Sequence, residues 1–442
     1  MTIASSNFTI MRYGEYADPT DLTTLPTAIR EIPMTGESLG YQTQSVSSQN
    51  INSSRQILDT IQTGYEVSGG VQIEMAPYIW DHLIQGALWA NWQTTPIALD
   101  DAVVSIDADA REITFAAETP FDATGATANK IKEGQFIQIR VGTSNSIAAG
   151  NTGIFQIEEV TSTSVAVVKA VDGATPFSGD ETSKNCCVRA SMIRAPKDGS
   201  STNMKRHVFL FEKEQSDLST PTFTYFKGCY VNNFSLNAQS SSLLTGSFDF
   251  MGSESAIATS TAVATHTAAM SFNGFNAVNH VGDVIINGKN LNGSTNEQFI
   301  QGLDFTVTNN LRGIKAIGHL ANIDTAAGML GVTGNLNVFF KNTEMYNLFV
   351  NQTEFGVSYS LINNATNEGY VISFPRVTIS NDSMSAGGQD QDIVENMQFT
   401  AMYDNTDQGG TYSSSGYQTS IQIDRFYDSY ARSDEITGEP FT

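Results

Sequence analysis

The chain has 442 residues, of which 40% are hydrophobic and 16% charged, and its formal net charge is −23 at pH 7. This length is too great for one ordinary hydrophobic core, so several domains are expected. The acidic balance weighs against a nucleic-acid binder, which needs a basic footprint, and no apolar run approaches the ~18 residues of a membrane span. The charge fits either plain solubility or a surface that repels polyanions.

Composition favours an all-β fold with a few short helices. The 36 glycines, together with Ser and Asn, punctuate short runs of alternating apolar and polar residues. This pattern is typical of β-sandwiches and β-barrels. Cys186, Cys187 and Cys229 form no disulfide framework, and residues 1–12 have no signal-peptide pattern. Free thiols and use in a cytosol are therefore expected.

The clearest predicted elements are a strand and the helix that follows it. Val67, Gly69, Val71 and Ile73 alternate with polar residues, and Trp80 and Leu83 then follow at helical spacing. Alternation with a period of two indicates a half-buried strand. Spacings of three and four indicate an amphipathic helix, on which we place His82 at a partly exposed position.

The same unit recurs in the second half of the chain, without gaps. The corresponding residues are Val332, Gly334, Leu336 and Val338 in the strand and Met345 and Leu348 in the helix. Upstream, Leu39, Tyr41 and Thr43 align with Leu303, Phe305 and Val307. A repeat of this length indicates a duplicated domain, which makes pseudo-symmetry available to an assembly.

Residues 94–193 interrupt the first copy and have no counterpart in the second. Their short alternating runs, separated by turn residues, predict an inserted small β-barrel or sandwich. We expect it to project outward and to be dispensable for assembly. The predicted organisation is a discontinuous first domain (1–93 and 194–270), the insertion (94–193), a second domain (271–430) and a C-terminal arm (431–442).

Two segments, residues 44–64 and 308–331, are too long for hairpin turns. Loops of this length in compact domains are usually functional or disordered. They mix polar and apolar residues with an arginine: Asn50, Ile51, Arg55, Ile57 and Leu58 in the first, and Arg312, Ile314 and Ile317 in the second. Such a mixture suits an interface that is buried on assembly, and a mobile surface loop is the alternative.

Catalytic and metal-binding motifs are not found in the sequence. The histidines His82, His207, His266, His280 and His319 are scattered, without metal-ligand spacing. The sequence has no phosphate-binding glycine loop and no nucleophile elbow. We therefore predict no enzyme activity, no cofactor and no metal.

Several short motifs resemble one known family. Residues 32–39 (IPMTGESL), Ser54-Arg55-Gln56 and residues 64–69 (GYEVSG) resemble the opening of tail tube proteins of long-tailed, siphovirus-type bacteriophages. Residues 244–248 (LTGSF) resemble a later part of the same domain. Val332-Thr333-Gly334 and Phe374-Pro375 repeat the resemblance in the second half, so it covers nearly everything except the insertion.

The resemblance implies a β-sandwich or barrel with one flanking helix. Subunits of the family close into rings, usually of six domains, whose inner sheets merge into one barrel. A duplicated chain would then form a three-chain, pseudo-sixfold ring. Rings would stack through the long loops, with Arg55 meeting an acidic group of the next ring.

The implied product is a tube in the virion tail, assembled in the bacterial host cytoplasm without membrane insertion. Its acidic lumen would hold the tape-measure protein and later pass the DNA genome, with the tail terminator and distal tail proteins at its ends.

Two other functions remain open from the sequence. A tail-tip or surface adhesive β protein would bind host carbohydrate and would carry a surface aromatic cluster. A hydrolase on a β scaffold would need paired carboxylates or a metal in a concave site.

Overall fold

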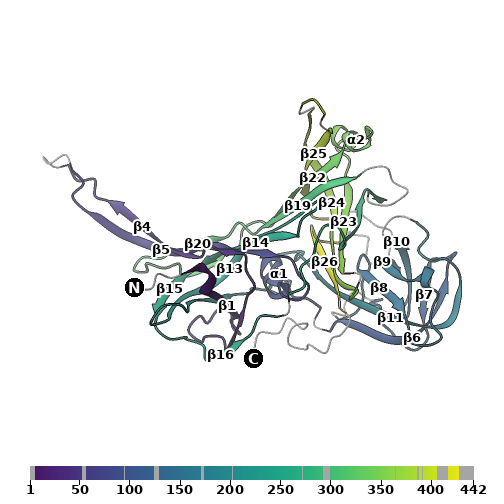
Figure 1. The fold of residues 1–442 in the computed structure, drawn as a ribbon, viewed down its shortest axis with the longest axis horizontal. Coiled ribbons are helices and arrows are strands. Elements are labelled where there is room, and N and C mark those ends of the chain that lie inside the picture. The colour runs from purple at the N-terminus through teal and green to yellow at the C-terminus, as the bar shows by residue number, and fades with distance from the viewer. Residues whose placement is uncertain are drawn as a thin grey trace.

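The computed structural model of the chain describes residues 5–51, 56–93, 95–123, 129–170, 174–201, 203–270, 272–291, 299–363, 365–385, 388–390, 392–405 and 417–427. These residues form β-strands and two short α-helices, which confirms the predicted all-β class. Figure 1 shows a central body, a long two-stranded arm and a separate lobe.

The first unit contains the N-terminal strands and those that follow the insertion. Its elements are η1 (Ser6–Phe8), β1 (Thr9–Glu15), β2 (Ala28–Glu31), β3 (Gly36–Glu37), β4 (Gly40–Ser47), β5 (Thr60–Glu74), α1 (Asp81–Leu88), β12 (Phe209–Gln215), β13 (Thr222–Gln239), β14 (Thr245–Gly252), β15 (Glu254–Ala258) and β16 (Thr265–Thr267). The long strand β13 pairs with β12 and β15 over its first half and with β14 over its second. It therefore links an outer sheet to an inner sheet.

The second unit contains the C-terminal strands. Its elements are β17 (Val281–Ile286), β18 (Lys289–Asn290), β19 (Ile300–Thr308), β20 (Arg312–Ile314), β21 (Asp324–Ala326), β22 (Gly331–Phe339), α2 (Glu344–Val350), β23 (Phe355–Asn363), β24 (Glu368–Ser385), β25 (Val394–Ala401) and β26 (Gln422–Phe426). Here β24 takes the place that β13 has in the first unit, because it pairs with β23 and β26 and then with β25.

The lobe between α1 and β12 is a closed antiparallel barrel. Its strands are β6 (Ile97–Asp107), β7 (Glu112–Phe115), β8 (Phe136–Val141), β9 (Gly153–Val160), β10 (Val165–Ala170) and β11 (Glu181–Arg194), with a 3₁₀ turn η2 (Ala149–Asn151). They pair in the order β6-β7-β10-β9-β8-β11, and β11 pairs with β6 to close the barrel. The barrel has a hydrophobic core of its own, as expected for an independent insertion.

One inner sheet runs through both units in the order β4-β5-β14-β13-β19-β22-β25-β24. The two units meet where β13 pairs with β19, from Asn233 opposite Thr308 to Gln239 opposite Gly302. The side chains on one face of this sheet belong to a continuous core that spans both units.

The pairing pattern of β5 recurs in β22. Gly69 lies opposite Phe250, and Gly334 lies opposite Phe399. A Cβ at Gly69 would lie 2.2 Å from the Ser38 carbonyl oxygen, and one at Gly334 would lie 2.4 Å from that of Asp304. Both positions therefore need glycine, and this close approach of neighbouring strands explains why the residue recurs in the sequence.

The sequence alignment of the preceding strand needs a correction of two residues. Tyr41 lies opposite Val67, whereas Val307 lies opposite the corresponding Val332. Leu39 and Tyr41 therefore correspond to Phe305 and Val307. A shift of two keeps every side chain on the same face of the sheet, so the alternation alone could not detect it.

Both helices bury the residues that the sequence predicted for the core, namely Trp80, Leu83, Met345 and Leu348. Every residue of α1 is buried, including His82, so the predicted partly exposed position of His82 is wrong. The helix packs against β13 and β19 of the inner sheet as well as β11 of the insertion, and Glu15 and His207 lie near His82. Burial lowers the pKa of His82.

A buried ion pair joins the two units and the insertion. Arg425 of β26 donates to Asp81 of α1 at 2.7 Å, and both side chains are almost completely buried. The same carboxylate accepts hydrogen bonds from Tyr370 and Tyr427, at 2.7 and 2.5 Å. Arg425 also donates to Ser191 of β11. These contacts satisfy both oxygens of a carboxylate that would otherwise be costly to bury.

We predict that Arg425→Met lowers the free energy of unfolding by about 3–5 kcal/mol, because it leaves the Asp81 carboxylate buried without a cation. Urea denaturation followed by tryptophan fluorescence measures this loss. The double variant Asp81→Asn/Arg425→Met removes both charges and should be more stable than the single variant. A single variant within about 1 kcal/mol of wild type contradicts the prediction.

Candidate assembly site

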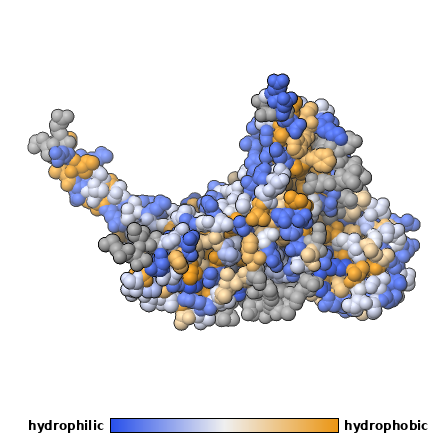
Figure 2. All heavy atoms as spheres, viewed as in Figure 1, coloured by the Kyte–Doolittle hydropathy of each residue, from blue (hydrophilic) through white to orange (hydrophobic). Residues whose placement is uncertain are grey.

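The arm carries a row of exposed apolar residues. Strands β4 and β5 extend as a two-stranded ribbon away from the body, and apolar residues lie along it (Figures 1 and 2). Its exposed apolar residues are Tyr41, Val46, Ile51, Ile57, Leu58 and Ile61. Ile51 and Ile57 near the tip are 103% and 70% exposed. An isolated ribbon is marginally stable in water, so this one is suited to contact another molecule.

The first predicted loop, residues 44–64, is instead the outer part of a long hairpin, because residues 44–47 and 60–64 are paired strand and only the segment between them is the tip. Asn50 is exposed there beside Ile51. Arg55 lies outside the described residues, so its expected contact with an acidic group stays a prediction.

The second predicted loop folds back as a small hairpin at the base of the arm. Strands β20 and β21 pair from Arg312 to Ile314, and Ile317 at the turn is fully exposed. The backbone N–H of Tyr65 in the arm donates to the Leu320 carbonyl at 3.1 Å. Lys315 also donates to the side chain of Gln44. The structure thus brings the two loops together, which the sequence did not predict.

The inner sheet has one face turned away from the core, and this face is polar and acidic. We call it the polar face. It presents Glu66, Glu74, Asp249 and Asp304 among serine, threonine, asparagine and glutamine side chains. The inner-sheet segments 40–47, 60–74, 230–239, 245–252, 300–308, 331–339, 377–385 and 394–401 contain no Lys, Arg or His. A phosphate group passing this face would meet no cation on these strands.

Hydrogen bonds between side chains hold parts of this face in place. Asn233 donates to Asp249 at 3.2 Å in the first unit, and Asn335 donates to Asp304 at 2.7 Å in the second. Cross-strand pairs of this kind fix the carboxylates on a rigid sheet. The negative charge is thus a fixed property of the face.

The inner sheet ends in two edges that have no partner strand among the described residues. At one end, β4 pairs with β5 alone. At the other, residues 381–385 of β24 pair with β25 alone. Unpaired N–H and C=O groups along such edges are a template for pairing with another chain.

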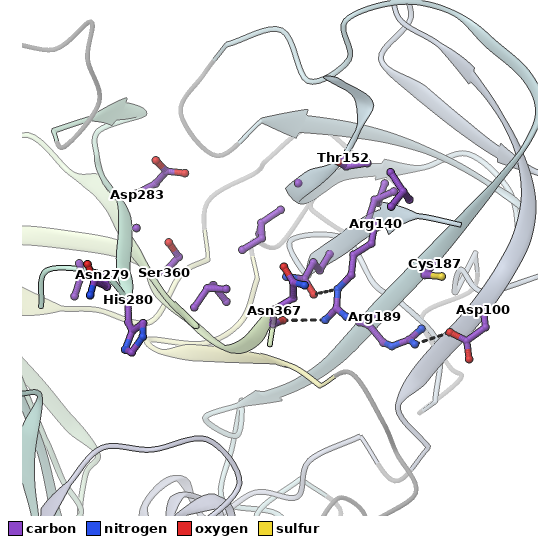
Figure 3. Close-up of a pocket in the computed structure, with 18 residues that line it drawn as sticks. Asp100, Arg140, Thr152, Cys187, Arg189, Asn279, His280, Asp283, Ser360 and Asn367 are labelled. Atoms are coloured by element: carbon purple, nitrogen blue, oxygen red, sulfur yellow. Dashed lines mark hydrogen bonds and ion pairs between the residues drawn. The ribbon is translucent and has the colours of Figure 1, made fainter. Parts of the chain in front are cut away.

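A groove of about 660 Å³ lies between the insertion barrel and the second unit (Figure 3). Its two arginines already have partners: Arg140 donates to Gln138 and to the Asn367 carbonyl, and Arg189 pairs with Asp100. Its described lining contains no Phe, Tyr or Trp. The aromatic platform expected for a carbohydrate site is therefore not present in this groove.

Within the described residues, no group of three or more His, Cys, Asp or Glu side chains is placed to hold a metal ion. Neither described helix is long and apolar enough to cross a membrane. Cys186, Cys187 and Cys229 are free, as the sequence predicted.

Comparison with known protein families gives a match over almost the whole chain. The model of the phage tail tube protein family matches residues 9–401. The chain belongs to this family. No curated protein matches it. Phage tail tube proteins are structural components of the virion tail, and the tail is therefore where this protein is located.

A tail tube is built from many copies of its subunit. The arm, the free edges and the polar face are therefore surfaces of a subunit that assembles with other copies of itself. The sequence identified the arm by its length but did not single out the other two surfaces. One signal was available: Ser, Thr, Asn and Asp alternate with apolar residues along the inner strands, where basic residues are missing.

We predict that the β20–β21 hairpin restrains the base of the arm. Replacing residues 312–326 with Gly-Gly removes the Leu320 carbonyl that accepts from Tyr65 and the Lys315 amine that donates to Gln44. Amide hydrogen exchange at Tyr65 should become at least tenfold faster, while the strand pairs at the centre of the inner sheet keep their protection. Unchanged exchange at Tyr65 contradicts this role.

Proposed function

We propose that this tail tube protein closes into rings of three chains, in which β24 of one chain pairs with β4 of the next. The observation that carries this proposal is the β13–β19 pairing, which already joins two similar units edge to edge. The edge strands β4 and β24 correspond in position to β19 and β13. The chain-to-chain junction would repeat the internal one.

The positions of the bulges allow this pairing to be written residue by residue. β13 has a bulge between Val231 and Asn233, and β24 has one between Ile379 and Asn381. Aligning the bulges makes Ser383 equivalent to Ser235, which lies opposite Thr306. Thr306 corresponds to Gly40 in the first unit. Ser383 should therefore lie opposite Gly40 of the next chain.

The paired side chains are chemically compatible in this register. Met384 falls opposite Leu39, as Leu236 lies opposite Phe305 in the internal junction. On the polar face, Asn381 falls opposite Gln42. Apolar residues thus meet apolar residues on the core side, and polar residues meet on the other.

Each chain would contribute two tube domains, about 1–93 with 194–270 and 271–430, as expected of a duplicated domain. Three chains then make a pseudo-sixfold ring. Because the contact is head to tail and closes on itself, lateral growth stops at the ring.

The polar face would line the bore. Its carboxylates would repel the DNA backbone, and the absence of basic residues from its strands would avoid the cumulative phosphate binding that stalls DNA. The tape-measure protein would occupy the bore before DNA passes. The tail terminator and distal tail proteins would bind the exposed rings at the two ends of a long tail.

The arm and the β20–β21 hairpin would contact the neighbouring ring. Their exposed apolar residues, including Ile51, Ile57, Leu58, Ile314 and Ile317, would become buried when rings stack. The insertion would decorate the outside. It also covers Ile362, Val371 and Phe426 of the second unit through Phe136, so deleting it would expose apolar surface as well as remove a decoration.

The ring is tested by a disulfide across the proposed junction. Directly opposed residues in an antiparallel pair have Cα atoms about 4.5–5.5 Å apart, within reach of a disulfide. Gly40 has room for a Cβ. Oxidised tubes of the double variant Gly40→Cys/Ser383→Cys should give a covalent product of three chains on a non-reducing gel, and reduction should return single chains.

The matched control is Gly40→Cys/Asn381→Cys, in which the second cysteine is two residues out of register and should link poorly. Oxidised wild type controls for Cys186, Cys187 and Cys229. A ladder that continues to six chains contradicts the three-chain ring. Intact tubes without any link contradict the register.

Stacking is tested by the triple variant Ile51→Ser/Ile57→Ser/Leu58→Ser. Because these side chains are exposed, the stability of the chain should change by less than about 0.5 kcal/mol. Rings should still close, as reported by the Gly40–Ser383 disulfide, but sedimentation and electron microscopy should find no long tubes. Tubes of normal length contradict a stacking role for the arm tip.

A further inference from the structure

We propose that Tyr41, Asp382 and Glu395 form a polar lock at the chain-to-chain junction, which makes ring closure favoured by acid while the internal junction is insensitive to pH. This inference rests on the proposed function, because it requires β24 of one chain to pair with β4 of the next.

The lock begins with two carboxyl groups on the core side of the inner sheet. Asp382 lies on β24, and Glu395 lies on the neighbouring strand β25, one pleat away. Burial raises the pKa of Glu395, and Asp382 lies close enough for its charge to raise that pKa further. Glu395 is 1% exposed, on the same face of its strand as the core residues Met397 and Phe399.

Three of the four oxygens of these carboxyl groups have no hydrogen-bond partner among the described residues. Both Asp382 oxygens and Oε1 of Glu395 are buried without a hydrogen bond of good geometry to any described residue. Two carboxylates cannot hydrogen-bond to each other, but a carboxylic acid and a carboxylate can, so the arrangement favours one shared proton.

Among the described residues, no cation contributes to the pKa shifts of this pair. β22 places Val338 opposite Glu395, and α2 contributes the core residues Met345 and Leu348. Glu344 of α2 is paired with Lys289, and Lys341 and Asp392 are exposed near the strand ends. Across the proposed junction, Glu37 of the next chain would lie near the pair, and it already forms an ion pair with Lys213 of its own chain.

The internal junction has apolar residues at the equivalent positions. Phe234 corresponds to Asp382, Gly246 to Glu395 and Val307 to Tyr41. Phe234 lies opposite Val307 and stacks on Phe248 with ring centroids 4.7 Å apart. The internal pair Leu236–Phe305 corresponds to another apolar pair, Met384–Leu39, in the proposed junction. The internal apolar pair Phe234–Val307 corresponds there to the polar pair Asp382–Tyr41.

Tyr41 supplies the missing donor. In the free chain Tyr41 is 44% exposed, and its hydroxyl oxygen accepts from Gln62 at 3.4 Å. In the proposed register Tyr41 lies opposite Asp382, so its hydroxyl can donate to that carboxyl group. Ring closure would then bury three polar groups that satisfy one another, provided the pair holds its proton.

The pH dependence follows from the direction of the shifts. Burial, followed by the charge of Asp382, raises the pKa of Glu395 to about 7, and burial also raises the pKa of Asp382. The folded chain therefore binds more protons than the unfolded chain, and this contribution to stability is complete below about pH 4.5 and lost as pH rises through 7. Because the next chain would bury the Asp382–Glu395 pair further, assembly should also favour the protonated form of the pair.

The test measures the critical concentration for tube formation by sedimentation at pH 6 and pH 8. If assembly needs one proton on a group with a pKa of about 7, the critical concentration should rise about tenfold over this interval. The variant Asp382→Asn/Glu395→Gln should abolish the rise. So should Tyr41→Val/Asp382→Phe/Glu395→Gly, which copies the internal junction.

A control separates the lock from other titrating groups. The pKa of Asp424 is raised to about 8, chiefly by burial, and its carboxylate accepts from the Phe136 N–H of the insertion at 3.3 Å. This group affects folding far from the junction, so Asp424→Asn should keep the tenfold rise in critical concentration.

The two proposals fail in distinguishable ways. If the Gly40–Ser383 disulfide forms three-chain rings but wild-type assembly is equally strong at pH 6 and pH 8, the lock is overturned and the ring stands. The same holds if both junction variants retain the tenfold rise. If intact tubes form without any such disulfide, the register is overturned, and the lock, which depends on that register, falls with it.

Discussion

The pairing of β13 with β19 is the interaction on which the rest of the molecule depends. It turns two units, each with an inner sheet of its own, into one continuous sheet with a shared core. Phe234 and Phe305 meet edge to face across it, with ring centroids 5.5 Å apart. Because this junction lies within one chain, its formation does not depend on protein concentration. The inner sheet therefore keeps two outer edges at which other chains could pair.

The buried cluster around Asp81 and Arg425 complements that junction on the other side of the core. It ties α1 of the first unit to β26 of the second, and Ser191 brings in the last strand of the insertion. Such a cluster adds less net stability than an apolar core of the same volume, but it is strongly directional. It therefore suits the role of fixing the relative orientation of the first unit, the second unit and the insertion. Apolar packing alone fixes orientation less specifically.

Much of the fold could be predicted from the sequence because the signals were local. The alternation from Val67 to Ile73, and its recurrence from Val332 to Val338, identified strands that the structure confirms. Other features depended on contacts distant in sequence. His82 was misplaced because strands from distant parts of the chain, β13, β19 and β11, pack around its helix. The upstream strand was misaligned because a two-residue shift leaves the alternation unchanged. Asp382 and Glu395 are unremarkable in the sequence, since strand pairing brings them together.

The edge strands face two opposing demands. An edge that pairs readily with its partner also pairs with the wrong strand, and natural sheets limit this with inward-pointing charges. Asp382 and Glu395 point to the core side of such an edge, at positions where the internal junction has Phe234 and Gly246. A wrong partner that offers an apolar strand would leave their oxygens buried without a donor, at a cost of several kcal/mol. In the proposed ring, β4 of the next chain would offer the Tyr41 hydroxyl at this place and so avoid that cost. Having carboxyl groups where the internal junction has Phe234 and Gly246 thus makes the unpaired edge less stable, and it also lets the edge discriminate among partner strands.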